Sequence, residues 1–479
     1  MGDGPRRGSG KLVQAPRQTD FIIARASHQP NVPGRGIVAS YSPMFWGLVV
    51  LVGVGSGIAG ALLIELLRAV QHLAWSYSSG SFLDAVKHAS AGRRLIVLSI
   101  GGVAAGGGAL VLARLGSVAV PEALWLREAR LPLFGSIARG IHSIVIVALG
   151  ASLGREAAPQ ATGAALGSTL ADWAGLPDWQ RRLLVACGAG AGMAAVYNVP
   201  LGGALFALEV LLGTLALPLV LPALATALIA TAIAWSVVPS APTYTIPGYA
   251  VNASQIVWAV IVGPIAGLAA VAYVRLITAA HAMRPSGAMR VVIPIFVFVA
   301  LGAISIAYPE VLGNGKNVVQ LALVAQLGAV LLAVLLVLKP IVTAACLASG
   351  APGGLLTPTL AYGVLLGGLL GKGWSELWPG APLGSYAIIG GAAVLGASMQ
   401  GPLAAIVLLL EFTHHSDALM VPILLAVVGA TVVARILGAP SIYSARISPA
   451  SAADGAAEEP QRDLLPASMG GEPGPSRLS

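Results

Sequence analysis

Long stretches without acidic or basic side chains constrain this chain more than any other feature. No Asp, Glu, Lys or Arg occurs in the ranges 210–274, 317–338, 340–371 and 377–410. A helix needs about 20 apolar residues to cross the hydrocarbon core of a bilayer. Each run therefore has room for at least one crossing, and the first has room for two or three. These runs predict an all-α, polytopic membrane protein.

The composition and both ends of the chain agree with this class. Apolar residues make up 57% of the sequence and charged residues only 10%, whereas soluble proteins carry about 25% charged residues. Residues 1–45 are polar and basic and lack the apolar core of a signal peptide. Such a segment favours a cytoplasmic N-terminus, so the net charge of +8 indicates topology and contact with anionic lipid rather than nucleic-acid binding. Residues 447–479 have the composition of a disordered tail.

Two segments about 200 residues apart resemble each other, which predicts an internal duplication. Residues 188–209, GAGAGMAAVYNVPLGGALFALE, match residues 390–411, GGAAVLGASMQGPLAAIVLLLE, at a constant offset. A similar match covers the regions around residues 154–167 and 354–367. The pairs in register include Pro200 and Pro402, Glu209 and Glu411, Gly154 and Gly354, and Glu156 opposite Leu356. We therefore expect two homologous halves, at 46–236 and 250–446, joined by a connection at 237–249.

Glycine and proline break the apolar runs in both halves. The clearest breaks are LPLFGSIARG, NVPLGGALFALE, GAPGGLLTPTL and QGPLAAIVLLLE. Broken helices at membrane depth must be buried or line a polar cavity, and paired breaks in two halves point to a transport site between them. A helix that begins there presents free N–H groups and the positive end of its dipole to an anion. We expect an anion site where the helix starts near Pro121, Gly154 and Gly353 converge.

Four motifs resemble those of the CLC family of chloride channels and transporters. They are GREAAP at 154–159, SGAPGGLLTP at 349–358, GSVAVPEA at 116–123 and IYSA at 442–445, and the resemblance extends over roughly 46–446. It implies a homodimer in which each subunit has one anion pathway and two inverted repeats of broken, tilted helices. It also implies chloride or another small anion as the ligand, no cofactor and no metal. A bacterial inner membrane is the expected location.

The resemblance further assigns roles to individual residues. Glu156 takes the place of the gating glutamate, which blocks an anion site when ionised and leaves it when protonated. Tyr443 matches a tyrosine whose hydroxyl donates to the central anion, and Arg139 matches a basic position that lends positive potential to the pathway. The alternatives are a structural ion pair between Glu156 and Arg155, an interfacial Tyr443 and a snorkelling Arg139. The other anion-binding candidates are Ser117, Val118, Gly154, Arg155, Gly354, Leu355 and Leu356.

Several positions depart from the family pattern. Ala157 and Ala158 follow Glu156 where the family has glycine and proline, and Leu356 replaces a phenylalanine. Val118 stands where chloride-selective members have serine, which motivates a fluoride-handling relative as one alternative. Val210 stands where proton-coupled members carry a second glutamate. This difference favours passive, voltage- or proton-gated conduction, with chloride/proton antiport as the second reading.

Other kinds of chemistry find little support in the sequence. Glu411, His414 and His415 are too few ligands for a metal site without further Cys or carboxylate at suitable spacing. No His-Glu-x-x-His, Gly-x-Ser-x-Gly or phosphate-binding loop is present. An enzyme is therefore not expected. The two alternatives from other functional classes are an intramembrane enzyme and a structural membrane scaffold. For Glu209 and Glu411 we expect pairing with loop residues or with a dimer partner rather than a role in transport.

Overall fold

The computed structural model describes residues 41–116, 118–126 and 128–447. In these residues the regular elements are helices, joined by a single isolated β-bridge between Gly154 and Gly354. The first half contains α2 (Pro43–Trp75), α3 (Phe82–His88), α4 (Ala91–Leu115), α5 (Val120–Leu126), α6 (Leu133–Ala148), α7 (Ala157–Trp173), α8 (Asp178–Tyr197), α9 (Pro200–Leu205), the π-helix η1 (Phe206–Leu212) and α10 (Leu217–Ala234). The second half contains α11 (Ala253–Ala282), α12 (Met289–Ala307), η2 (Pro309–Val311), α13 (Lys316–Leu323), α14 (Ala329–Ala348), α15 (Leu356–Leu377), α16 (Leu383–Met399), α17 (Pro402–Thr413), η3 (Asp417–Leu419), α18 (Met420–Ile436) and η4 (Ser444–Arg446).

Seven helical stretches of the described residues are long and apolar enough to cross a membrane. They are α2, α4 with α5, α10, α11, α12, α14 and η3 with α18. Between them lie shorter apolar helices, including α6, α9 with η1, α16 and α17. The predicted all-α polytopic fold with broken helices is confirmed.

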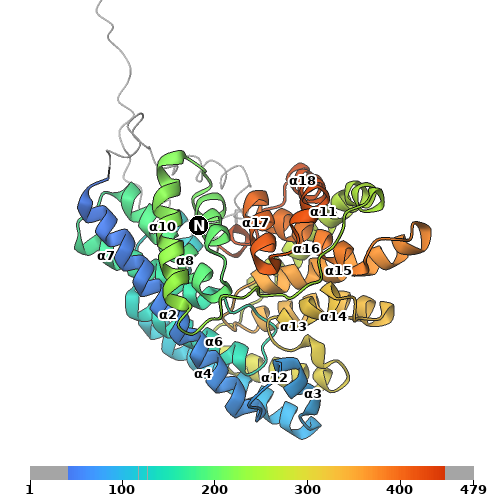
Figure 1. Cartoon of the computed structure of the whole chain (residues 1–479). Helices are drawn as coiled ribbons and strands as arrows, with labels where there is room; N and C mark the ends of the chain where they lie inside the picture. Colours follow the sequence, from blue (N-terminus) through green and yellow to red (C-terminus); the bar gives the residue numbers. More distant parts are fainter. Residues whose placement is uncertain (1–40, 117, 127, 448–479) are drawn as a thin grey trace, which may run out of the picture.

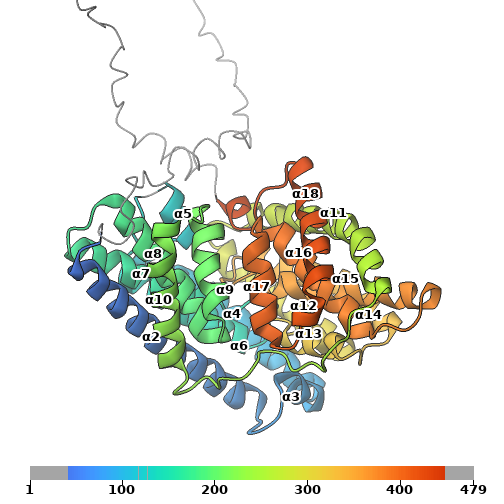
Figure 2. The same ribbon diagram turned by 45° about the horizontal axis from the view of Figure 1, so that its top comes forward.

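The two halves lie side by side. α2, α7, α8 and α10 form one group, and α11, α15, α16 and α18 form the other (Figures 1 and 2). The short helices α9 and α17 contact each other where the groups meet. The residues that begin α7 and α15 also come together there, through the Gly154–Gly354 bridge.

One sequence expectation about the crossings is wrong. The run 317–338 contains only α13 and the first half of α14, and α14 continues through Lys339 to Ala348. A buried lysine at membrane depth is costly unless its ammonium group is hydrogen-bonded. Lys339 Nζ donates to the carbonyl oxygens of Val311 at 2.7 Å and Gly313 at 2.8 Å. The lysine therefore fixes the chain after η2 instead of ending the helix.

Small residues set the closest helix packing, as the glycine cluster of α4 indicates. A Cβ on Gly102 would lie 2.7 Å from the Cα of Ile295, and one on Gly106 would lie 2.7 Å from the Cα of Val291. Both contacts are with the backbone of α12 and are too short for any side chain. Glycine thus permits α4 and α12 to pack at backbone distance.

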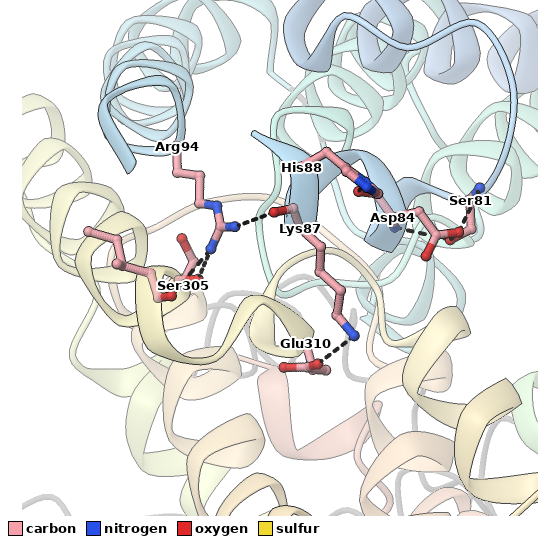
Figure 3. Close-up of polar contacts among 8 residues, drawn as sticks. Ser81, Asp84, Lys87, His88, Arg94, Ser305 and Glu310 are labelled. Atoms are coloured by element: carbon pink, nitrogen blue, oxygen red, sulfur yellow. Dashed lines mark hydrogen bonds and ion pairs between the residues drawn. The ribbon is translucent and has the colours of Figure 1, made fainter. Parts of the chain in front are cut away.

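The two faces of the molecule follow from the order of the helices. We call the face where α2 begins the near face and the face that carries α3 the far face. α5 lies at the near face, at the top of Figure 2, and α3 lies at the bottom. Figure 3 shows how α3 and α4 are tied to the second half at the far face. Lys87 forms an ion pair with Glu310 at 3.0 Å, and Arg94 Nη1 donates to the Ser305 carbonyl at 2.5 Å.

Candidate anion-binding site

The site is built on the backbone crossing of Gly154 and Gly354. The N–H of Gly154 donates to the Gly354 carbonyl at 2.7 Å, and the N–H of Gly354 donates back at 2.8 Å. α7 begins three residues after Gly154, and α15 begins two residues after Gly354. The first turns of two helices therefore meet at one point. Residues that the repeat placed in register are in direct contact.

The Glu156 side chain occupies the start of α15. It is only 1% exposed, and its Oε1 accepts a hydrogen bond from the N–H of Leu356 at 2.7 Å. Its Oε2 accepts one from the Tyr197 hydroxyl at 3.0 Å and lies 3.5 Å from Thr357 Oγ1. The first N–H groups of a helix are the donors that a bound anion would use. The carboxylate thus fills an anion position formed by the other half of the molecule.

Glycine is required at this crossing because the carboxylate lies against the backbone. A Cβ on Gly154 or on Gly354 would overlap the carboxylate atoms of Glu156. A Cβ on Gly353 would lie 2.5 Å from the Cβ of Leu153. The glycines in both motifs therefore admit the glutamate side chain, as they would admit an anion.

Arg155 packs over the ring of Tyr197. Its guanidinium carbon lies 4.9 Å from the centroid of the Tyr197 ring, an arrangement that favours a cation. No ion pair joins Arg155 to Glu156 among the described residues. The alternative of a structural pair between these two residues is not realised.

A cavity of about 650 Å³ opens on the far-face side of Glu156. Arg155 and Tyr197 line it, together with Arg68, Lys316 and Glu310. Burial and then the neighbouring charges of Arg155 and Arg68 lower the pKa of Lys316 to about 8. The cavity is therefore a polar space with several cations next to the gate candidate.

Tyr443 is 4% exposed and packs edge-on against Phe206, with ring centroids 5.3 Å apart. Its hydroxyl finds no hydrogen-bond partner among the described residues. It lies within electrostatic range of the Glu156 carboxylate. The tyrosine is thus a buried hydroxyl donor, and an interfacial anchoring position does not describe it.

The other candidate residues differ in their burial and in their neighbours. Val118 is half-buried between α4 and α5, and Leu355 is buried at the N-cap of α15. Arg139 lies on α6 within electrostatic range of Arg446 and Glu122. Ser117 lies outside the described residues.

Val210 and the two repeat-related glutamates occupy the contact between α9 and α17. Val210 is 2% exposed in η1, and its Cγ2 would lie 2.7 Å from a Cβ on Gly401. Glu209 accepts hydrogen bonds from the N–H groups of Leu403 and Ala404 at the start of α17. Glu411 accepts the equivalent bonds from Leu201 and Gly202 at the start of α9. Pairing with loop residues or with a dimer partner was expected, whereas each glutamate here pairs with backbone N–H groups at a helix start of the other half.

Sequence reasoning missed Tyr197 and singled out Thr357 only as part of a motif. Their hydroxyl groups lie 2.7 Å apart, and both contact Glu156 Oε2. Tyr197 ends α8 directly before the NVPLGG break. The position of this tyrosine directly before a helix break was the one sign in the sequence of a role at the site.

Comparisons with known proteins agree on one family. A sequence profile described as "Voltage gated chloride channel" matches residues 102–435. A ClcB-like protein of Ralstonia nicotianae is 34% identical over 411 residues, which cover 82% of this chain and 94% of that protein. The voltage-gated ClC-type chloride channel ClcB of Citrobacter koseri is 30% identical over 407 residues, covering 81% of this chain and 96% of the relative.

Solved structures share the fold. A slow cyanobacterial Cl⁻/H⁺ antiporter superposes with a TM-score of 0.76 at 20% identity, over 88% of this chain and all of that one. A CLC-type fluoride/proton antiporter superposes with a TM-score of 0.66, also at 20% identity, over 84% of this chain and 97% of that one. At this identity the likeness establishes architecture alone.

Proposed function

This chain belongs to the voltage-gated chloride channel (CLC) family of chloride transport proteins, and we propose that it conducts chloride passively through a pathway gated by Glu156. It is an integral membrane protein with multiple spans, and a transport protein rather than an enzyme. The proposal concerns the mode of transport and the residues that carry it.

The hydrogen bond from the Leu356 N–H to Glu156 Oε1 carries the proposal. An ionised carboxylate and a chloride ion compete for the same helix start, because both are anions that accept from the first N–H groups. Protonation makes the side chain neutral and weakens its hold on those donors. The side chain then moves into the far-face cavity next to Arg155, and chloride takes its place.

Val210 supports conduction over coupled exchange. In coupled exchange, a proton that reaches Glu156 from the far face needs a second ionisable group to leave at the near face. The resemblance to the CLC family implies that proton-coupled members have a glutamate at the position of Val210. Val210 is apolar and buried, so it offers no such relay. Chloride/proton antiport is the second candidate, since Glu156 itself binds a proton.

Selectivity and assembly are also part of the proposal. Val118 offers no side-chain hydroxyl where chloride-selective members have serine, so bromide, nitrate and fluoride should be compared with chloride. We propose a homodimer in a bacterial inner membrane with a cytoplasmic N-terminus, supported by the family resemblance and the basic first 45 residues. We also propose that residues 46–236 and 250–446 form the two repeats.

Purified protein in liposomes tests the mode of transport when chloride and pH electrodes record together. Passive conduction predicts chloride efflux that stops at electrochemical equilibrium, without uphill proton movement. Proton uptake against a gradient, driven by chloride and abolished without protein, would instead establish antiport. No anion flux at either acidic or neutral pH would refute both candidates.

A further inference from the structure

The far-face cavity beside Glu156 is large enough for a small organic molecule. Its volume is about 650 Å³, and small-molecule sites in proteins commonly measure about 300–1,000 Å³. Both halves of the molecule contribute to its lining, from α2 in the first half to the start of α13 in the second. A single chloride ion would fill only a small part of this space. The cavity can therefore admit a ligand larger than the transported ion.

Two cations that line the cavity lack acidic partners. Neither Arg155 nor Lys316 forms an ion pair within the described residues. Arg155 Nε is buried and finds no hydrogen-bond acceptor there, although most buried donors in proteins are hydrogen-bonded. Burial, followed by the charges of Arg155 and Arg68, lowers the pKa of Lys316 to about 8. An anion that contacts both cations would relieve the repulsion between them.

The other charged side chains of the cavity already have partners. Arg68 pairs with Glu65 at 2.6 Å. Glu310 pairs with Lys87 at 3.0 Å, across the contact that Figure 3 shows. The cavity thus presents two positive charges without a counterion, and both lie next to the gate candidate.

Few other groups near Lys316 can change their charge. The remaining titratable side chains in the lining are His72, Tyr77 and Tyr197. Lys339 approaches Gly315 from α14, but two backbone carbonyls hold its ammonium group. α15 and α16 pack against α13, yet the part of them that the structure describes adds no charged residue to the lining. A loss of positive charge above neutral pH should therefore fall mainly on Lys316.

We propose that the far-face cavity binds a small dicarboxylate, with one carboxylate on Arg155 and the other on Lys316. A guanidinium group matches a carboxylate with two parallel hydrogen bonds, whereas an ammonium group acts as a point charge. Two separate cations thus call for two anionic groups on one molecule. The site rests on the proposed chloride pathway and adds an inhibitory ligand to it. A bound dicarboxylate would fill the space that chloride and the protonated Glu156 side chain need, and so block flux.

Titration calorimetry with succinate on the purified, full-length protein tests the site directly. Lys316→Gln should weaken succinate binding about tenfold, which corresponds to a loss of roughly 1.4 kcal/mol, whereas Lys316→Arg should retain binding. In liposomes the succinate concentration for half-maximal inhibition of chloride flux should change by the same factor. Lys372→Gln is the matched control, because Lys372 lies on α15 and does not line the cavity. It should bind succinate as the wild type does.

Two measurements on the wild-type protein need no variant. Lys316 is charged below its pKa of about 8 and neutral above it, so succinate binding should weaken as the pH rises through this value. In Lys316→Arg the affinity should stay constant over the same range, since arginine remains charged. Propionate carries a single carboxylate and should bind the wild-type protein about tenfold more weakly than succinate, or weaker still.

The inference fails if succinate does not bind, if propionate binds equally well, or if Lys316→Gln keeps the wild-type affinity. Should Lys316→Gln aggregate, the wild-type pH series and the comparison with propionate decide the matter, and constant affinity across the pH series would overturn the site. Wild-type protein without chloride flux would refute the proposed function, whereas normal flux without succinate binding refutes only this site.

Discussion

Two of the contacts between the halves place carboxylates at helix starts, and they do so differently. At the contact of α9 and α17, Glu209 caps the helix of the second half and Glu411 caps the helix of the first. At the Gly154–Gly354 bridge the backbone is equally symmetric. There, however, Glu156 faces Leu356, and only the start of α15 receives a carboxylate.

The difference separates structure from function. At the contact of α9 and α17, each half supplies one carboxylate to a helix start of the other half. Both carboxylates are held in the same way, so we expect both to stay in place. The unmatched Glu156 is a single charge held by hydrogen bonds beside a cavity that could receive it. We infer that the symmetric pair stabilises the fold and that the asymmetric residue opens and closes the pathway.

Gly354→Ala should disturb the asymmetric crossing most. The new Cβ would overlap the Glu156 carboxylate, and steric overlap of this kind costs about 1–3 kcal/mol. Chloride that takes the place of the carboxylate would meet the same Cβ, so chloride flux should fall roughly tenfold to a hundredfold at both neutral and acidic pH. Radiolabelled or electrode-based efflux from liposomes measures the change.

Two controls show whether this effect passes through the carboxylate. Gly107→Ala, on α4, meets no atom within 4 Å and should leave flux unchanged. In a Glu156→Ala background, Gly354→Ala should still reduce flux, because the Cβ meets the anion itself. Unchanged flux in that background would show that the Cβ acts on the carboxylate alone.

Glu209→Ala and Glu411→Ala test the symmetric contact between α9 and α17. Each removes the acceptor of two backbone N–H groups, so each should destabilise the protein by about 1–3 kcal/mol. Thermal unfolding in detergent should show lower midpoints for both variants, and Glu376→Ala, an exposed change on α15, should show none. The pH dependence of flux should stay as in the wild type. A changed pH dependence with normal stability would make these glutamates part of the gate.

Tyr197→Phe should have the smallest effect. It removes one hydrogen bond to the charged form of Glu156, at 3.0 Å from Oε2. A bond to a charged group contributes at most about 1.5–3 kcal/mol, so the pH of half-maximal flux should rise by no more than roughly one to two units. Flux measured over a pH series gives the midpoint. Tyr249→Phe, which removes a hydroxyl bond to the Leu323 carbonyl, is the control and should not shift it.

Much of this arrangement could be predicted from the residues. The charge-free runs indicate the membrane class, and the repeat register sets Gly154 against Gly354 and Glu156 against Leu356. The helix starts at Ala157 and Leu356 followed from the glycine motifs.

The remaining contacts depend on tertiary structure. Tyr197 reaches Glu156 from α8, and its position directly before a helix break does not by itself show which group its hydroxyl contacts. Lys339 appeared to divide two apolar runs, yet the carbonyls of Val311 and Gly313 accept from it and the helix continues.

The pH dependence of chloride flux in Glu156→Gln tests the central claim most directly. The amide has nearly the shape of the protonated acid and cannot ionise, so it cannot return to the blocking anionic form. Liposome efflux should be high at every pH, whereas wild-type efflux should increase as pH falls. A Glu156→Gln protein whose flux still increases on acidification, over the same range as the wild type, would contradict the role of Glu156 as the gate.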